Sequence, residues 1–171
     1  MYSDARREVW TVGDVSFTAV GPGEELRPPA SKPLDRVAAG VRSALLTALL
    51  NEGSTEADIR EFDPGREAIL PLLTRQHALR NTPGQWGYGA IDGTAVPEEF
   101  LLVHPIDSRV SEIVIYSDGY PNAYPSLGEA ESALAALLAA DPLCINELMS
   151  TKGWAKNNVS FDDRAYVRFS L

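Results

Sequence analysis

The sequence contains few of the residues that usually hold transition metals or form cross-links. It has one cysteine, Cys144, and two histidines, His77 and His104, in 171 residues. A single cysteine excludes an internal disulfide and any zinc site built from several cysteines. We therefore expect Cys144 to be a small buried apolar residue. His77 ends an apparent helix, and His104 follows a strand, where it could act as an acid or base. We expect structural roles for both, since a lone histidine is more often structural.

Basic residues and long apolar runs are also scarce. The chain has 15 Lys and Arg against 24 Asp and Glu, which gives a formal net charge of −9. This acidic balance argues against a nucleic-acid partner and suits a protein that binds cations. No apolar run approaches the ~18 residues that cross a membrane, and charges interrupt the N-terminal stretch where a signal peptide needs an apolar core. The expected location is the cytoplasm.

The hydrophobic content of 44% is enough to build a core, and we expect a single domain over residues 1–171. Strands are predicted at 8–12, 15–20, 87–91, 100–103, 112–116 and 164–171. Helices are predicted at 37–50, where Gly53 is the C-terminal cap, and at 126–142, where Ser126 is the N-terminal cap. A short helix is predicted to start at Ser54 or Thr55, and another at Pro64, which Pro71 kinks or divides into two. A further helix is predicted at 142–149. This pattern of helices between terminal strands indicates an α+β or layered α/β class.

Two connections carry strong local signals. Gly13-Asp14 lies between two predicted strands, as in a tight β-hairpin. Residues 21–33 are rich in proline and glycine and are expected to form an exposed loop. Residues 80–95 form a second glycine-rich stretch, in which aromatic side chains serve either ligand recognition or packing within the loop.

Acidic residues stand at three strand ends. Asp14 lies in the predicted hairpin turn, Asp118 follows the apolar strand IVIYS, and Asp162-Asp163 precede the last strand. Each is consistent with ordinary turn or edge chemistry. If the strands are neighbours, however, their carboxylates converge, and oxygen ligands of this kind suit Mg²⁺ or Mn²⁺. Two such ions can activate a water for attack on phosphorus.

The order of these motifs resembles the metal-dependent serine/threonine protein phosphatases of type 2C. The matching elements are Gly13-Asp14-Val15, the strand that runs into Ser117-Asp118-Gly119, and Asp162-Asp163 before RAYVRF. The resemblance covers the two ends of the chain. It implies a sandwich of stacked antiparallel sheets flanked by helices, and hydrolysis of phosphoserine or phosphothreonine in a phosphoprotein substrate.

The same resemblance implies a site. Asp118 and Asp162 would hold the catalytic Mg²⁺ or Mn²⁺ ions, two if the site is complete, and Asp14 matches a ligand of a more weakly held metal. The full implied ligand set is Asp14, Asp118, Gly119, Asp162 and Asp163. A metal-bound hydroxide would be the nucleophile.

The chain departs from the family in two respects. The family's Asp-Gly-x-Gly-Gly strand, whose Asp bridges the two metals, has no counterpart before Val12, and the Arg-bearing phosphate-binding segment is missing. The resemblance therefore implies a domain truncated at its N-terminus, a piece of a longer protein, or an incomplete site. The segment 37–95 matches no motif of the family.

Two other classes of function stay open. The chain could be a catalytically inactive binding or regulatory module that recognises a phosphorylated protein or pairs with another chain, including a second copy of itself. It could also be an N-terminal-nucleophile hydrolase, for which Ser3 is the candidate nucleophile.

Overall fold

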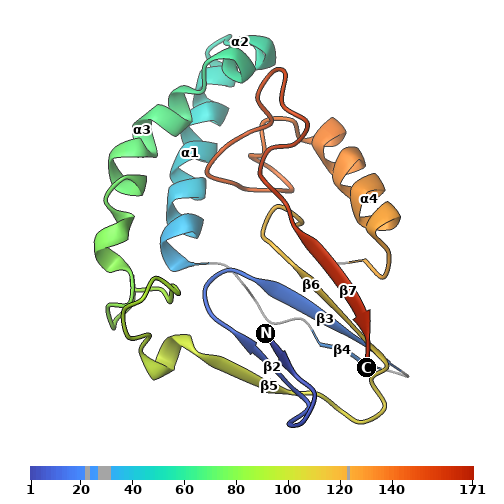
Figure 1. The fold of residues 1–171 in the computed structure, drawn as a ribbon. Helices are drawn as coiled ribbons and strands as arrows, with labels where there is room; N and C mark the ends of the chain where they lie inside the picture. The colour runs from blue at the N-terminus through green and yellow to red at the C-terminus, as the bar shows by residue number, and fades with distance from the viewer. Residues whose placement is uncertain (22–23, 27–31, 123) are drawn as a thin grey trace. The chain divides into compact units, whose positions relative to one another are not determined.

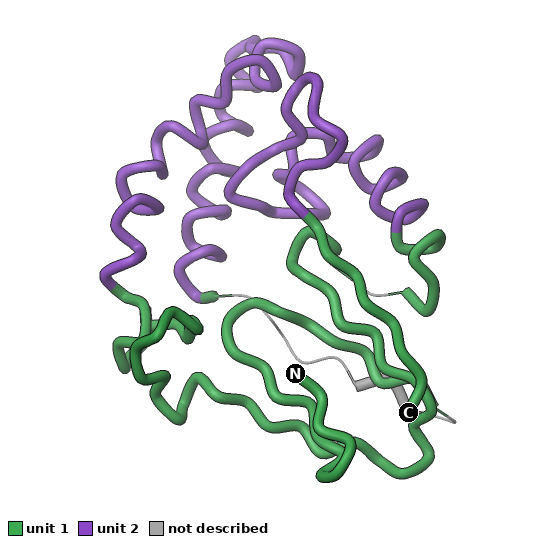
Figure 2. Tube along the Cα trace, in the orientation of Figure 1, with its two compact units in different colours: residues 1–32, 79–130, 164–171 green, residues 33–78, 131–163 purple. Residues whose placement is uncertain are grey.

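In the computed structural model, residues 1–21, 24–26, 32–122 and 124–171 are described. They form two compact units that alternate along the chain (Figure 2). Unit 1 comprises residues 1–32, 79–130 and 164–171, and unit 2 comprises residues 33–78 and 131–163.

Unit 1 contains two antiparallel sheets (Figure 1). One has the order β1-β2-β5 and the other has the order β4-β3-β6-β7. The strand bounds are β1 Tyr2–Ser3, β2 Glu8–Thr11, β3 Ser16–Gly21, β4 Glu24–Leu26, β5 Leu102–Pro105, β6 Glu112–Tyr116 and β7 Tyr166–Ser170. The strand predicted at 112–116 is confirmed with its bounds. The strand predicted at 164–171 is present but covers only 166–170, and the one predicted at 100–103 begins and ends two residues later.

The two sheets share one apolar core. Val9 from β2 and Phe17 from β3 are fully buried in the same cluster, together with Ile113 from β6. His104 on β5 packs edge-on against Phe17, with ring centroids 5.1 Å apart, and burial lowers the pKa of this histidine. His104 therefore joins the two sheets as a packing residue, as its sequence context indicated.

The predicted hairpin at Gly13-Asp14 is wrong, although both of its strands exist. β2 pairs with β1 and β5, whereas β3 pairs with β4 and β6. The connection carries the chain from one sheet to the other, with Gly13 at a φ of +79°. Because Val9 and Phe17 bury their side chains in one core from different sheets, the two strands face each other instead of pairing.

Two further local predictions in unit 1 need correction. In the expected loop 21–33, residues 24–26 form β4 against β3, and residues 22–23 and 27–31 lie outside the described residues. The expected strand 87–91 is reduced to a single bridge between Arg80 and Tyr88. The Asn81 side chain replaces backbone strand pairing at this point, because it both donates a hydrogen bond to the Ala90 carbonyl and accepts one from the Ala90 nitrogen, each at 2.9 Å.

The four α-helices of the described residues are those that the sequence predicted. They are α1 (Pro33–Asn51), α2 (Glu56–Glu61), α3 (Pro64–Leu73) and α4 (Leu127–Ala140), and short 3₁₀ turns cover Gln76–Leu79 and Glu98–Phe100. Gly53 ends α1 at a φ of +103°, and Ser126 caps α4 by accepting from the backbone of Glu129. α3 is continuous through Pro71, so it is not divided into two pieces.

The predicted helix over 142–149 is wrong. The chain there winds around the carboxylate of Asp141, which is buried and accepts hydrogen bonds from the backbone nitrogens of Ile145 (3.1 Å), Asn146 (2.8 Å) and Leu148 (3.2 Å). These nitrogens would bond to carbonyls one turn back in a helix. One side chain replaces those partners, so the helical pattern gives way to a turn.

Together these elements confirm the α+β class, with the strands in unit 1 and α1 to α3 in unit 2. Within the described ranges, every helix is too short or too polar to cross a membrane.

The capping box of α2 supplies a test of local stability. Thr55 accepts from the backbone of Asp58 at 3.2 Å, and the Asp58 carboxylate accepts from the Thr55 backbone at 3.4 Å. Thr55→Ala should lower the free energy of unfolding by about 1 kcal/mol in urea titrations followed by circular dichroism. The control is Thr47→Ala, an exposed position inside α1, which should stay within about 0.5 kcal/mol of the wild type. Equal losses in both variants would contradict the cap assignment.

Candidate functional site

The residues that the sequence analysis singled out fall in both units. Asp118 and Gly119 occupy the centre of a turn after β6, which is closed by a hydrogen bond from the backbone nitrogen of Tyr120 to the Ser117 carbonyl at 3.0 Å. Ser117 also exchanges hydrogen bonds with Ala165 just before β7, one of them through its hydroxyl. The Asp118-Gly119 pair therefore forms a turn at the end of β6, and the residue before it is bonded to the residue that precedes β7.

Lysine partners accompany two of the other predicted ligands. In unit 1, the Asp14 carboxylate lies 2.7 Å from the Lys32 ammonium, which also sits over the ring of Tyr88. In unit 2, the Asp162 carboxylate accepts a hydrogen bond from Lys152. A cation that bound to either carboxylate would first have to displace an ammonium group.

Asp163 is exposed, and its backbone nitrogen donates to the Asp162 carboxylate at 2.8 Å. The structure thus brings Asp162 and Asp163 together through a local turn. Among the described residues, no three His, Cys, Asp or Glu side chains are grouped so that they could hold a metal ion.

The most elaborate polar arrangement in the described chain lies elsewhere in unit 2. Residues 141–163 contain no helix or strand, yet they are fixed to α1, to α3 and to Arg60 of α2 by many hydrogen bonds. We call residues 141–163 the anchored segment. Structureless stretches of this length are uncommon in compact proteins and often carry function.

Arg42 of α1 is the main anchor. Its side chain is fully buried, and its guanidinium donates to the Asp63 carboxylate from two nitrogens, at 2.9 and 2.7 Å. The same group donates to the backbone carbonyls of Leu143 (2.8 Å), Cys144 (3.2 Å) and Ser150 (3.0 Å). These five bonds use all five N–H groups of an arginine. Arg42 is therefore committed to structure and has no donor left for a ligand.

Two glycines give Arg42 its space. A Cβ atom on Gly65 would lie 2.8 Å from the Arg42 side chain and 2.9 Å from Leu46. A Cβ atom on Gly153 would lie 2.8 Å from the guanidinium and 3.0 Å from the Leu143 carbonyl. The backbone thus closes tightly around the buried cation from both α3 and the anchored segment.

Two further arginines hold the segment from α2 and α3. Arg66 donates to the Thr151 carbonyl at 2.9 Å, and Arg60 donates through Nε to the Trp154 carbonyl at 3.0 Å. The Arg60 guanidinium lies 4.7 Å from the centre of the Trp154 ring. Each arginine thus donates a hydrogen bond to a backbone carbonyl that lies outside any helix or strand and would otherwise lack a partner.

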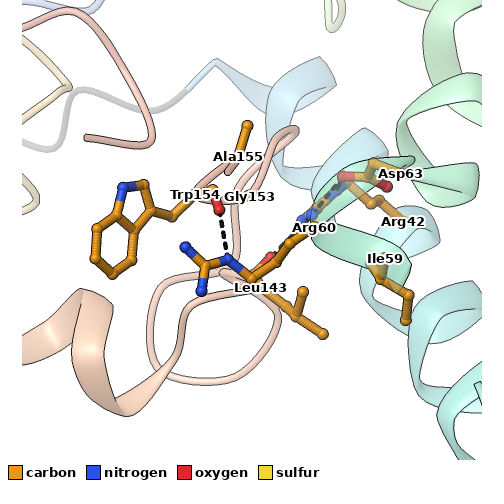
Figure 3. Close-up of a pocket in the computed structure, with 8 residues that line it drawn as sticks. All are labelled: Arg42, Ile59, Arg60, Asp63, Leu143, Gly153, Trp154 and Ala155. Atoms are coloured by element: carbon orange, nitrogen blue, oxygen red, sulfur yellow. Dashed lines mark hydrogen bonds and ion pairs between the residues drawn. The ribbon is translucent and has the colours of Figure 1, made fainter. Parts of the chain in front are cut away.

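A cavity of about 40 Å³ lies between these anchors (Figure 3). Its walls combine Arg42 and Asp63 with Arg60 and Trp154, and the figure shows the Arg60 guanidinium beside the indole. The remaining lining residues are Ile59, Leu143, Gly153 and Ala155. A space of this size holds a small polar group and no drug-sized molecule.

Cys144 is buried inside the anchored segment, as predicted. Burial, followed by the charge of Asp141, raises the pKa of its thiol to about 11. The thiolate, which is the reactive form, is therefore scarce at neutral pH. Burial and this raised pKa both make Cys144 slow to react as a nucleophile.

The sequence analysis missed Arg42, although the signal was present. Ala38, Arg42 and Leu46 are spaced by four residues along the predicted helix, and all three are buried. A charged residue on the apolar stripe of an amphipathic helix indicates a buried ion pair, because an isolated buried charge is too costly.

Comparisons with protein-family models, with curated protein sequences and with solved structures find no match to this chain.

The role of Arg42 can be tested with Cys144 as the reporter. Arg42→Met removes the donors to the Asp63 Oδ2 atom and to the carbonyls of Leu143 and Ser150, so it should destabilise the closed form of the anchored segment by about 3 kcal/mol. Alkylation of Cys144 by iodoacetamide under native conditions should then be about a hundredfold faster than in the wild type. The control is Arg6→Met, which removes an exposed arginine from unit 1 and should leave the rate unchanged. A rate in Arg42→Met equal to that of the wild type would show that Arg42 does not hold the segment.

Proposed function

We propose that this chain is a non-catalytic binding module that recognises a protein partner through the anchored segment. The observation that carries the proposal is the fixation of residues 141–163 by three arginines and one buried aspartate. A segment held in one conformation loses little entropy when it binds, and that favours affinity.

Exposed side chains on the segment support this function. Val159 is 84% exposed and Met149 is 60% exposed, although the backbone around them is fixed. Apolar side chains that are exposed on a fixed backbone are available to a partner without rearrangement of the segment. A partner that covered them would gain the free energy of burying apolar area.

The pairing of acids with lysines favours a binding module over a metal-dependent phosphatase. Lys32 forms an ion pair with the carboxylate of Asp14, and Lys152 forms one with the carboxylate of Asp162. A catalytic metal site keeps its carboxylates available for the cation. The phosphatase that the family resemblance implies is therefore the alternative against which the proposal is tested.

Metal binding separates the two functions directly. Mn²⁺ titration by calorimetry and hydrolysis of p-nitrophenyl phosphate should be measured for the wild type and for Asp118→Asn. A binding module should show no Mn²⁺-dependent turnover, and the two proteins should behave alike. Turnover that requires Mn²⁺ and disappears in Asp118→Asn would overturn the proposal and establish the hydrolase.

The binding face can be mapped by photo-crosslinking in extracts of the source cells. A benzoylphenylalanine at position 159 should form one defined adduct. The same group at position 91, which is 87% exposed in the wild type but lies in unit 1, should not form it. The same adduct from both positions, or from neither, would contradict recognition through the anchored segment.

A further inference from the structure

Arg60 differs from Arg42 and Arg66 because it holds the anchored segment through Nε and leaves its two terminal nitrogens without a hydrogen bond to the segment. Its Nε is bound to the Trp154 carbonyl, and the indole of Trp154 lies beside its plane at 4.7 Å. These two contacts fix the orientation of the fork without using either terminal nitrogen. An arginine oriented in this way is prepared to bind an oxyanion with two parallel hydrogen bonds.

Neither terminal nitrogen of Arg60 makes a hydrogen bond to a residue that the structure describes. The nearest acid is Glu56, one turn earlier on α2, at 3.8 Å from Nη1. That distance is too long for a hydrogen bond, and Glu56 itself is half exposed. The Arg60 side chain is 27% exposed and lines the cavity, so a ligand can reach it from solvent.

A second basic residue contacts Arg60 through its backbone. The backbone nitrogen of Lys156 donates to the Arg60 carbonyl at 3.4 Å, which places the lysine beside the end of α2. Its side chain is 67% exposed and lies 3.8 Å from Glu61, again beyond hydrogen-bond range. The ammonium therefore has the freedom to turn toward a ligand on Arg60.

We propose that Arg60 and Lys156 form an anion site that binds the phosphoryl group of a phosphorylated partner segment, with Trp154 packing against the bound chain. This inference rests on the proposed function and names the chemistry that the module recognises. The terminal nitrogens of Arg60 donate to two phosphoryl oxygens, and Lys156 supplies a second positive charge.

The local charge balance favours a phosphoryl group over a carboxylate. Glu56 and Glu61 already offset the charges of Arg60 and Lys156, so a ligand must compete with two resident carboxylates. A phosphoryl group carries nearly two negative charges and three acceptor oxygens at neutral pH, whereas a carboxylate carries one charge. The dianion gains more from two cations and can replace both glutamates at once.

The test is a titration of ¹⁵N-labelled protein with phenyl phosphate, followed by the indole signal of Trp154 and the Nε signal of Arg60. Benzoate is the matched carboxylate probe. Arg60→Gln and Lys156→Gln should each weaken phenyl phosphate binding, Arg60→Gln by about tenfold or more. Glu56→Gln removes the resident competitor and should strengthen binding by about twofold to fivefold.

Arg66→Gln is the control, because Arg66 anchors the same segment but does not line the cavity. Its affinity for phenyl phosphate should equal that of the wild type. Slow alkylation of Cys144 in each variant shows that the segment is intact. Lys156→Gln keeps the test decisive if Arg60→Gln opens the segment, since the Lys156 side chain holds none of it.

The inference fails if phenyl phosphate does not shift these signals, if benzoate binds equally well, or if both Gln variants bind like the wild type. Phosphatase treatment of the cell extract should abolish the photo-adduct formed at position 159 if the phosphoryl group belongs to a protein, and inorganic phosphate should compete with it. An adduct that survives both treatments would overturn the anion site and leave the binding module standing. Absence of any adduct would count against the module itself.

Discussion

The buried guanidinium of Arg42 is the interaction on which unit 2 depends. It connects the middle of α1 to the N-cap of α3 through Asp63, and it satisfies three carbonyls of a segment that has no regular structure. A buried ion pair contributes little net stability, but it penalises every arrangement that leaves one partner alone. We therefore infer that its contribution here is to the uniqueness of the conformation, because a path of the segment that moved its carbonyls away would leave a buried cation without partners.

Local sequence signals predicted the elements whose stability is local. The caps Thr55 and Ser126, the helical stripe of α1 and the apolar strand β6 all follow from neighbours in the chain. The errors occurred where distant residues decide the outcome. The Gly13-Asp14 turn is compatible with a hairpin, and only the burial of β2 and β3 in one core from two sheets rules the hairpin out.

The candidate site shows the same division. Aspartates at strand ends were easy to find, and their turn geometry was one of the two interpretations that the sequence allowed. The lysines beside Asp14 and Asp162 lie 18 and 10 residues away along the chain, a spacing that no motif encodes. The fork of Arg60 on Trp154 joins residues separated by 94 positions, so no local pattern could have indicated it.

The interleaving of the two units has a consequence for folding. Residues 131–163 of unit 2 separate β6 from β7 in the chain, although the two strands pair in unit 1. Until β7 pairs with β6, one edge of β6 presents unpaired backbone groups. That edge is then open to wrong pairing with another chain, so the late step of strand addition is also the one most exposed to aggregation.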